Sequence, residues 1–240
     1  HDAAVALEAI AQRAELITRS GAIGGFIGGD QTLTLGVLRG IHRAKKKAFG
    51  LLHIDSQSNV SGGPGDPAVH HASVIRHAVQ EGLIRADSTM QIGIRGPYAS
   101  SDDLSFARSH GFEIVSTDEV RWDIHAVVSQ VRKLVRKSAL YVTVDVSALD
   151  PASAPGTAFP LPGGINTWEL QQILRALVGA EIIGFDVVEI APTYDPSGIT
   201  AITGVSIVHE VLAALADTRR SARPAPSSHH STSRRGRRSA

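Results

Sequence analysis

Apolar and polar residues follow one another along the chain in two periods, and these periods predict a regular succession of helices and strands. Apolar residues spaced three and four positions apart predict helices over residues 3–18, 32–44, 73–84, 101–110, 118–137, 167–177 and 199–216. Short, nearly continuous apolar runs predict buried strands over residues 22–28, 48–55, 90–96, 113–116, 139–145 and 182–190. Because helices and strands alternate in this order, we expect a three-layer α/β domain with a mainly parallel sheet and helices on both faces.

The composition fits one such domain in a reducing compartment. The chain has 240 residues, of which 42% are hydrophobic, which is enough material for a single sizeable core. It has no cysteine, so disulfides, thiolate metal sites and a cysteine nucleophile are excluded, and we expect a cytoplasmic protein. No apolar run approaches the roughly 20 residues that span a membrane, and the first residues lack the basic region of a signal peptide. We therefore expect no membrane partner.

The charge is distributed unevenly between the body and the end of the chain. Residues 218–240 carry seven arginines and no acidic residue, although the formal net charge of the whole chain is only +1. This segment is rich in Arg, Ser and Pro and almost free of apolar residues, so we expect residues 1–217 to form the domain and residues 218–240 a disordered tail. Such a tail could contact nucleic acid. Without interleaved aromatic residues, however, we favour a solvated tail and no nucleic-acid partner.

Acidic residues stand where three of the predicted strands end. Asp55, Asp145 and Glu189 close or follow apolar runs, and Gln57 and Asn59 follow Asp55 at two-residue spacing. In extended backbone, that spacing places the side chains on the same side. The carboxyl ends of parallel strands meet at one edge of a sheet, where open α/β sheets bind their ligands. Long loops follow the same strands, and loops of that length in a compact domain are usually functional. We therefore expect one shared pocket.

Several segments resemble the ureohydrolase family, which contains arginases, agmatinases and guanidinobutyrases. The resemblance rests on Gly28-Gly29-Asp30-Gln31, Asp55-Ser56-Gln57-Ser58-Asn59, Asp145-Val146-Ser147-Ala148-Leu149-Asp150-Pro151, Ala154-Pro155-Gly156-Thr157, and Val188-Glu189-Ile190-Ala191-Pro192 followed by Tyr194-Asp195. These segments are similar to the family patterns G-G-D-H, D-A-H-x-D, D-x-D-x-L-D-P and V-E-V-x-P-x-Y-D, and they occur in the same order. Their form is closest to the agmatinase and guanidinobutyrase branch. The resemblance implies an arginase/agmatinase-like fold, and it implies that the family's first strand, which precedes these segments, is lacking.

The resemblance also implies a chemistry and a set of metal ligands. Family members hydrolyse a guanidino group to an amine and urea, using a hydroxide held by a pair of Mn²⁺ ions. Asp55 and Asp145 match the two carboxylates that bridge the metals. The four positions that bind a single metal carry neutral residues instead, and these are Gln31, Gln57, Asn59 and Ser147. Of the family's four carboxylates and two imidazoles, this chain keeps two carboxylates.

This loss of charge and of imidazole nitrogens predicts that the Mn²⁺ pair is absent or weakly bound. The loss of one second-shell partner typically costs about 10–100-fold in metal affinity, and here four direct ligands are changed. A single Mg²⁺ or Ca²⁺ on Asp55, Asp145, amide oxygens and water remains an alternative. Without metal the two carboxylates repel each other, so one is protonated or a cationic ligand lies between them.

Two candidate catalytic residues persist by resemblance. Glu189 matches the acid that pairs with the substrate guanidinium, and His71 matches a histidine that shuttles protons or contacts substrate. A structural ion pair for Glu189 and an ordinary loop position for His71 are the alternatives. His53 lies within a predicted strand, and we interpret it as a core histidine with satisfied hydrogen bonds.

The sequence therefore leaves three functions open. We favour a degenerate ureohydrolase homologue with little or no guanidino hydrolysis. The first alternative is an active amidinohydrolase that releases urea from agmatine, guanidinobutyrate or a related guanidino compound, with one metal or through Glu189 and His71. The second is a non-catalytic binding or subunit-interaction protein, since the resemblance implies a homo-oligomer or an assembly with a paralogue.

Overall fold

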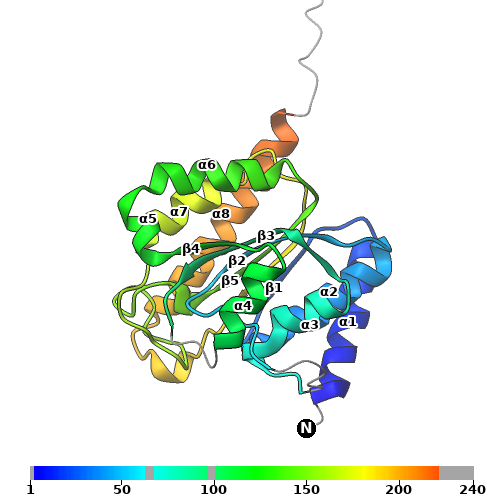
Figure 1. The fold of residues 1–240 in the computed structure, drawn as a ribbon, viewed down its shortest axis with the longest axis horizontal. Helices are drawn as coiled ribbons and strands as arrows, with labels where there is room; N and C mark the ends of the chain where they lie inside the picture. Colours follow the sequence, from blue (N-terminus) through cyan, green and yellow to red (C-terminus); the bar gives the residue numbers. More distant parts are fainter. Residues whose placement is uncertain (1–2, 63–67, 97–100, 222–240) are drawn as a thin grey trace, which may run out of the picture.

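The chain folds around one six-stranded sheet in which every neighbouring pair of strands is parallel (Figure 1). The structure is a computed structural model that describes residues 3–62, 68–96 and 101–221. The strand order is β1-β6-β5-β2-β3-β4. The strands are β1 (Gly24–Ile27), β2 (Phe49–Ile54), β3 (Ile84–Ile94), β4 (Glu113–Ser116), β5 (Leu140–Asp145) and β6 (Ile182–Val188). The expectation of a parallel α/β sheet is confirmed.

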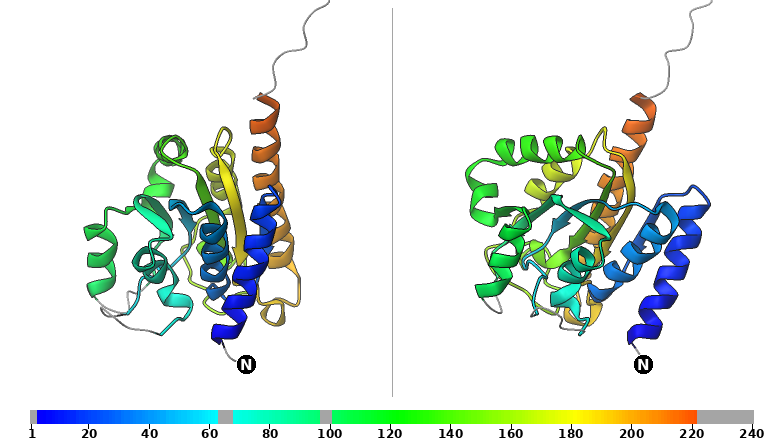
Figure 2. Two further views of the ribbon diagram at one scale, coloured as in Figure 1. Left: turned by 90° about the vertical axis from the view of Figure 1, so that its right-hand side faces the viewer. Right: turned by 45° about the vertical axis from the view of Figure 1, so that its right-hand side comes forward.

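Helices cover both faces of the sheet and complete a three-layer arrangement (Figures 1 and 2). The helices of one face are α1 (Ala3–Arg19), α2 (Thr32–Lys45), α3 (Val74–Gln80) and α4 (Ser101–Ser109). Those of the other face are α5 (Thr117–Trp122), α6 (Ile124–Val135), α7 (Thr167–Arg175) and α8 (Ile199–Ser221). Three short 3-10 helices lie in the loops: η1 (His71–Ser73), η2 (Val146–Ala148) and η3 (Pro192–Tyr194).

The three central strands explain the continuous apolar runs in the sequence. Every residue of β2, β5 and β6 is buried, because helices pack on both faces of these strands. Side chains that point to alternate faces of the sheet therefore enter two separate hydrophobic clusters: Leu52 and Ile54 belong to one, and Leu51 and Tyr141 belong to the other. A strand buried on both faces has no polar alternation.

The stretch over residues 118–137 is mainly helical, as predicted, but two helices occupy it. Helix α5 ends at Trp122, and α6 begins at Ile124. Asp123 between them is extended, with φ −154°, and its side chain accepts a hydrogen bond from the backbone N–H of Ala126 at 2.9 Å. An aspartate that caps the second helix breaks the first one, because the capping residue is itself not helical.

The predicted helix over residues 73–84 is too long, and the strand that follows it begins earlier than expected. Helix α3 ends at Gln80, because Gly82 adopts φ +67° and the backbone N–H of Leu83 turns back to the carbonyl of Ala78. Strand β3 then starts at Ile84 rather than at residue 90. Its first residues are partly exposed and polar, which removes the apolar signal that marks the rest of the strand.

Helix α8 extends beyond the predicted boundary of the domain. Residues 218–221 form its last turn, and Thr218 accepts a hydrogen bond from the backbone N–H of Gly179. Residues 222–240 lie outside the described residues, so a disordered tail there stays a prediction. Helix α8 is long and apolar enough to cross a membrane by length and composition, with a mean hydropathy of 1.8 and 33% of its apolar window buried. Its residues Ile207, Val211 and Ala214 belong to the hydrophobic core on one face of the sheet. The absence of a membrane partner also stays a prediction.

Candidate functional site

The carboxyl ends of four adjacent strands bring the sequence-predicted residues together. In the sheet these strands are neighbours in the order β1, β6, β5, β2. They enclose a narrow cavity of about 10 Å³, which is the space that one water molecule needs. We call it the carboxyl-end pocket, and its lining residues are Gln31, Gln57, Asn59, His71, Asp145, Ser147, Thr157, Phe159 and Glu189. Every predicted site residue lines it except Asp55, which is buried beside it.

Asp55 is held by hydrogen bonds from its own surroundings. Its Oδ2 accepts from the Asn59 amide nitrogen at 2.6 Å and lies 2.9 Å from His53 Nε2. Its Oδ1 accepts from the Gln57 backbone N–H at 2.8 Å. The Gln91 side-chain amide donates to His53 Nδ1, so His53 Nε2 carries the proton and donates it to Asp55. The buried carboxylate is thus satisfied without a cation.

Ser147 joins the two retained carboxylates. Its backbone N–H donates to Asp145 Oδ1 at 2.7 Å, and its hydroxyl lies 3.3 Å from Asp55 Oδ1. The same hydroxyl is 2.9 Å from the hydroxyl of Ser56. A serine at this position therefore supplies hydrogen-bond donors where the resemblance places a metal-binding carboxylate.

Gln31 is fixed by two threonines at the bottom of the pocket. Its side-chain nitrogen donates to the hydroxyls of Thr34 and Thr143, both at 3.1 Å. Its carbonyl oxygen Oε1 is buried and has no hydrogen-bond partner among the described residues. The hydroxyl of Thr157, which also lines the pocket, is likewise buried without a partner there. A buried unpaired polar atom is costly, so these two atoms mark where a polar ligand or water would bind.

A second buried carboxyl group lies behind Gln31 in the core. Asp186 Oδ2 accepts from the hydroxyls of Thr34 at 2.8 Å and Tyr141 at 2.7 Å. Burial raises the pKa of Asp186 to about 6, although the hydroxyls of Thr143, Tyr141 and Thr34 oppose this shift. The hydroxyl of Thr34 thus connects the side chain of Gln31 to Asp186 in the core, because it accepts from the first and donates to the second.

Asp145 and Glu189 carry the acidic character of the pocket. Burial raises the pKa of Asp145 well above its usual value, and the nearby carboxylates of Asp55 and Glu189 raise it further. Burial also raises the pKa of Glu189, while the backbone N–H of Gln31, which donates to its Oε1 at 2.8 Å, lowers it. Repulsion between the two retained aspartates was expected from the sequence, and the raised pKa of Asp145 agrees with it.

Two pocket residues have a left-handed backbone that side chains rarely adopt. Asn59 has φ +52° and Glu189 has φ +62°. Asparagine tolerates this conformation, but glutamate does not favour it, and such a residue typically costs on the order of 1 kcal/mol. The predicted strand over residues 182–190 ends at Val188 for this reason. The turn at Glu189 directs its carboxylate to the backbone of Gln31 and into the pocket.

His71 lies at the mouth of the pocket. Its ring stacks on Phe159 with a centroid distance of 5.1 Å, and its Nδ1 is 3.9 Å from Asp30 Oδ2. Both rings are partly exposed. Among the described residues that line the pocket, His71 and Phe159 are the two that carry aromatic rings.

Arg95 holds the loops around the pocket in place. Its guanidinium donates to the backbone carbonyls of Ser147 at 2.7 Å, Ala148 at 3.0 Å and Leu161 at 2.7 Å. The backbone N–H of Arg95 also donates to the carbonyl of Ser56. Burial lowers the pKa of Arg95, against the raising effect of nearby carboxylates such as Asp150. One cation thus fixes the segments that carry Ser147 and the loop of Thr157.

The donor set does not suit a pair of Mn²⁺ ions. Within residues 3–62, 68–96 and 101–221, no group of three or more His, Cys, Asp or Glu side chains is arranged to hold a metal. The Asn59 side chain donates an N–H to Asp55, and an N–H cannot ligate a cation. Hard divalent ions need several carboxylate or imidazole ligands, and these are not gathered here.

The sequence interpretation missed three contributors. His53 was expected to be a satisfied core residue, which is correct, but it also bonds directly to Asp55. The two-residue spacing of His53 and Asp55 along one strand was the available signal. Phe159 and Asp186 gave no such signal, because the first lies in a long loop and the second within an apolar run.

Comparisons with known proteins agree on one family. The protein-family model described as "Arginase family" matches residues 1–214 of this chain. The chain is 38% identical to guanidinopropionase of Pseudomonas aeruginosa over 194 residues, 80% of this chain and 60% of that protein. It is 34% identical to guanidinobutyrase of the same organism over 212 residues, 88% of this chain and 66% of that protein. The chain thus spans less than two thirds of the length of these relatives.

Solved structures show the same fold. The structure of proclavaminate amidino hydrolase from Streptomyces clavuligerus superposes with a TM-score of 0.83 at 33% identity, covering 91% of this chain and 72% of that one. The structure of a hypothetical agmatinase from Burkholderia thailandensis gives a TM-score of 0.81 at 31% identity, covering 92% of this chain and 69% of that one.

Proposed function

This chain belongs to the arginase family, and we propose that it is an agmatinase-like member that binds a small guanidino compound with little or no hydrolysis. Asp145 and Glu189 line the pocket with Asp55 beside it, and their carboxyl groups can pair with a bound cation. The substituted positions remove the means of holding a metal-bound hydroxide, and without an activated nucleophile the guanidinium carbon is not attacked.

One observation carries this proposal. Both oxygens of Asp55, a bridging ligand by family resemblance, are already engaged by Asn59, Gln57 and His53 at 2.6–2.9 Å. A metal ion at this carboxylate would have to displace donors that are themselves buried. Each displaced donor then loses its partner, and a buried donor without a partner typically costs about 1–3 kcal/mol.

Binding of a guanidinium cation is supported by the acceptors that face the pocket. Gln31 Oε1 and the hydroxyl of Thr157 have no hydrogen-bond partner among the described residues, and the carboxyl groups of Asp145 and Glu189 line the same space. A planar guanidinium has five N–H donors and pairs well with a carboxylate. The pocket holds about one water molecule, so the rings of His71 and Phe159 must separate to admit such a ligand.

The names of the relatives select the compounds to test. Guanidinopropionate, guanidinobutyrate and agmatine are offered to the protein with added Mn²⁺, and urea release and heat of binding are measured. We expect binding without urea, and weaker binding for Glu189→Gln, which keeps the shape of the side chain and removes its charge. Sustained urea release would instead support the alternative of an active amidinohydrolase. Absence of both heat and urea would reject guanidino binding.

A second experiment separates lost ligands from an unsuitable scaffold. The variant Gln31→His, Gln57→His, Asn59→Asp and Ser147→Asp restores the family's ligand types. We expect it to unfold more easily with a chelator, because added carboxylates would face Asp55 and Asp145, and to regain thermal stability with Mn²⁺. The same titration on the unaltered protein serves as the control, where Mn²⁺ should leave the melting temperature unchanged.

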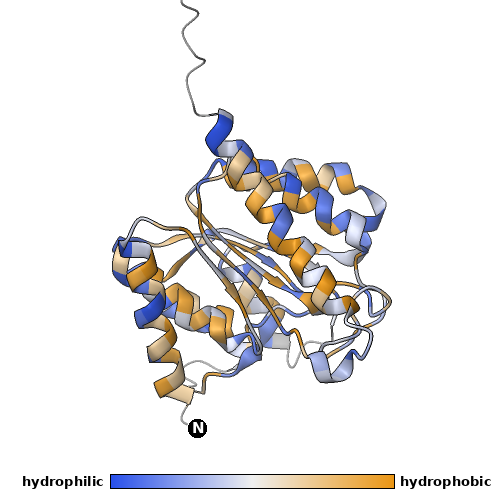
Figure 3. Ribbon diagram, turned by 180° about the vertical axis from the view of Figure 1, so that it is seen from behind, coloured by the Kyte–Doolittle hydropathy of each residue, from blue (hydrophilic) through white to orange (hydrophobic). Residues whose placement is uncertain are grey.

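A second candidate function, subunit interaction, is favoured by one apolar region. Strand β1 is an edge of the sheet with Ile27 exposed, and α1 and α8 lie on either side of this end of the sheet (Figures 2 and 3). Helix α8 exposes Ile202 and Val205, which are 70% and 68% accessible, and α1 exposes Leu16. An unpaired strand edge beside apolar side chains is suited to pair with a second copy of this chain. Sedimentation velocity of the unaltered protein and of Val205→Asp tests it: a dimer that the variant dissociates supports this function.

A further inference from the structure

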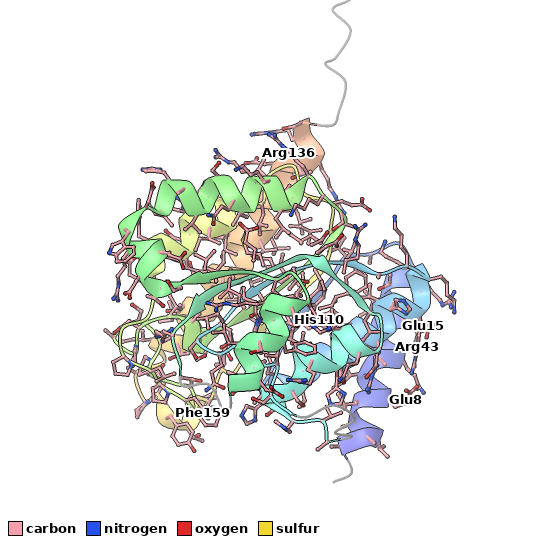
Figure 4. The ribbon with its side chains drawn as sticks, viewed as in Figure 1. Glu8, Glu15, Arg43, His110, Arg136 and Phe159 are labelled. Carbon is pink, nitrogen blue, oxygen red and sulfur yellow. The ribbon has the colours of Figure 1, made fainter. Side chains whose placement is uncertain are left out.

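A larger cavity lies at the opposite end of the sheet from the carboxyl-end pocket. Its volume is about 270 Å³, and it opens where β2, β3, β5 and β6 begin. We call it the amino-end cavity, and its lining residues are Lys45, Lys47, Ala48, Phe49, Arg85, Lys137, Ser138, Ala139 and Glu181. Figure 4 labels Arg136, the neighbour of Lys137, and Phe159 of the carboxyl-end pocket at opposite ends of the molecule.

Positive charge dominates this cavity. Three lysines and Arg85 line it, against the single carboxylate of Glu181. Arg85 pairs with Asp87 at 3.0 Å. Among the described residues, no carboxylate oxygen lies within 4.0 Å of the amines of Lys45, Lys47 or Lys137. These three amines are therefore available to a ligand.

The backbone around the cavity is fixed by hydrogen bonds between strands and loops. The Gly50 N–H donates to the carbonyl of Ala139, and the Leu140 N–H donates to the carbonyl of Glu181. The Lys46 N–H donates to the carbonyl of His42 and ends α2 in a left-handed turn. The Ser138 hydroxyl at the cavity wall is shielded from solvent and has no hydrogen-bond partner among the described residues. This hydroxyl lies against Gly50, inside the wall rather than facing the cavity.

Helix ends explain only part of this charge. Lys45 lies in the last turn of α2, and Lys137 follows α6, so each is favourable beside the negative end of a helix. Lys47 follows α2 by two residues, as Lys137 follows α6, whereas Arg85 lies on a strand, where no such effect acts. Four cations from three separate parts of the chain converge on one cavity, and helix capping does not require that convergence.

We propose that the amino-end cavity binds a small anion that carries two or more phosphate groups. Lysine ammonium groups bind phosphate as point charges, and the guanidinium of Arg85 can bind it through two N–H donors. The volume is close to the lower end of the range for small-molecule sites, about 300 Å³, which exceeds what a single small ion needs. This site is independent of guanidino binding at the other end of the sheet.

Calorimetric titration with inorganic diphosphate tests the proposal, with orthophosphate and sulfate as smaller anions. We expect diphosphate to bind with a dissociation constant below about 1 mM and more tightly than either single anion. The variant Lys45→Gln with Lys137→Gln should weaken binding by about tenfold or more, since each lysine contributes a charge-assisted contact. Lys133→Gln, an exposed lysine of α6 that does not line the cavity, is the matched control and should change binding less than about twofold.

Three outcomes would overturn the proposal. The first is no measurable binding of diphosphate at millimolar concentration. The second is equal weakening by the double variant and by the Lys133→Gln control, which would indicate attraction to the whole surface rather than to the cavity. The third is tighter binding of a short single-stranded oligonucleotide than of diphosphate, which would identify a nucleic-acid surface. Circular dichroism of each variant confirms that the fold is retained.

Discussion

The two ends of the sheet gather polar side chains in opposite ways. At the carboxyl end, Asp55 accepts hydrogen bonds from Asn59, His53 and the backbone of Gln57, and the cavity left over is about 10 Å³. At the amino end, three lysines have no acidic partner among the described residues, and the cavity is about 270 Å³. The residues expected to bind metal are thus mostly hydrogen-bonded within the protein. The lysines at the amino end, which belong to no sequence motif, line an open cavity.

Burial explains the difference. Asp55 and Gln31 are about 1% exposed, so a polar group there must be paired within the protein. The lysines at the amino end are exposed, and water satisfies them at little cost. Substitutions of the buried residues at the carboxyl end should therefore change the stability of the fold. Substitutions of the exposed lysines at the amino end should change only ligand binding. The predictions below test this comparison in order of expected effect.

The largest effect is expected at Asp55. Asp55→Ala leaves the N–H groups of Asn59, His53 and Gln57 without an acceptor in a buried site, and we expect the free energy of unfolding to fall by about 3–5 kcal/mol. Denaturant unfolding followed by circular dichroism measures it. Thr157→Ala is the control, since the Thr157 hydroxyl has no hydrogen-bond partner in the described part of the chain and its removal should cost little. A loss below about 1 kcal/mol for Asp55→Ala would contradict the view that this carboxylate is a structural group.

The next effect depends on pH and concerns Asp186. Its pKa is raised from 3.8 to about 6, so the folded chain holds a proton that the unfolded chain has released. The ionisation of Asp186 therefore lowers the free energy of unfolding as pH rises from about 4 to about 6. Asp186→Asn cannot ionise, and its stability relative to the unaltered protein should improve by about 3 kcal/mol across that range.

Asp195 offers a control of opposite sign for the same measurement. Hydrogen bonds from Ser197 and Thr200 lower the pKa of Asp195 to about 2. The stability that the Asp195 carboxylate contributes is therefore present above about pH 4 and is lost as pH falls toward 2. Asp195→Asn should therefore lose stability relative to the unaltered protein at neutral pH. A pH-independent difference between Asp186→Asn and the unaltered protein would contradict the raised pKa.

A smaller effect is expected at Arg95. Arg95→Ala removes the guanidinium that donates to the carbonyls of Ser147, Ala148 and Leu161, of which Ala148 keeps the bond from the Ile165 N–H, and we expect the free energy of unfolding to fall by about 2 kcal/mol. Because these carbonyls belong to the loops around the pocket, hydrogen exchange of residues 147–161 should also accelerate. Arg121→Ala, which removes a single bond to the carbonyl of Gly164, should cost less. Equal losses of unfolding free energy in the two variants would contradict the view that Arg95 holds the loops around the pocket.

The smallest effect is expected at the amino end. Lys45→Gln with Lys137→Gln should change the free energy of unfolding by less than about 0.5 kcal/mol, since both side chains are exposed and form no ion pair among the described residues. Thermal unfolding of the variant used for the diphosphate titration measures it. A loss as large as that of Arg95→Ala would mean that these lysines are structural, and the contrast between the two ends would disappear.

Much of the fold could be predicted because its strands are buried on both faces. The continuous apolar runs of β2, β5 and β6 and the helical periods between them indicated a parallel three-layer domain, and the sheet has that form. Local hydrogen bonds decided the exceptions. The cap at Asp123 divided one predicted helix, and the turn at Gly82 shortened another.

The sequence by itself determined which residues stand at the carboxyl ends of the strands and which of the family's ligand types are missing, because side-chain period and strand order follow from the chain. Only the tertiary structure decided which hydrogen-bond partners those residues have. Asp55 meets Ser147, ninety-two positions away, and Gln31 meets Thr143, one hundred and twelve positions away. The amino-end cavity is likewise a product of folding, since Lys45, Arg85 and Lys137 carry no motif and read individually as surface residues. Hydrogen bonds and electric fields depend on distance in space, and spacing along the chain does not contain that distance.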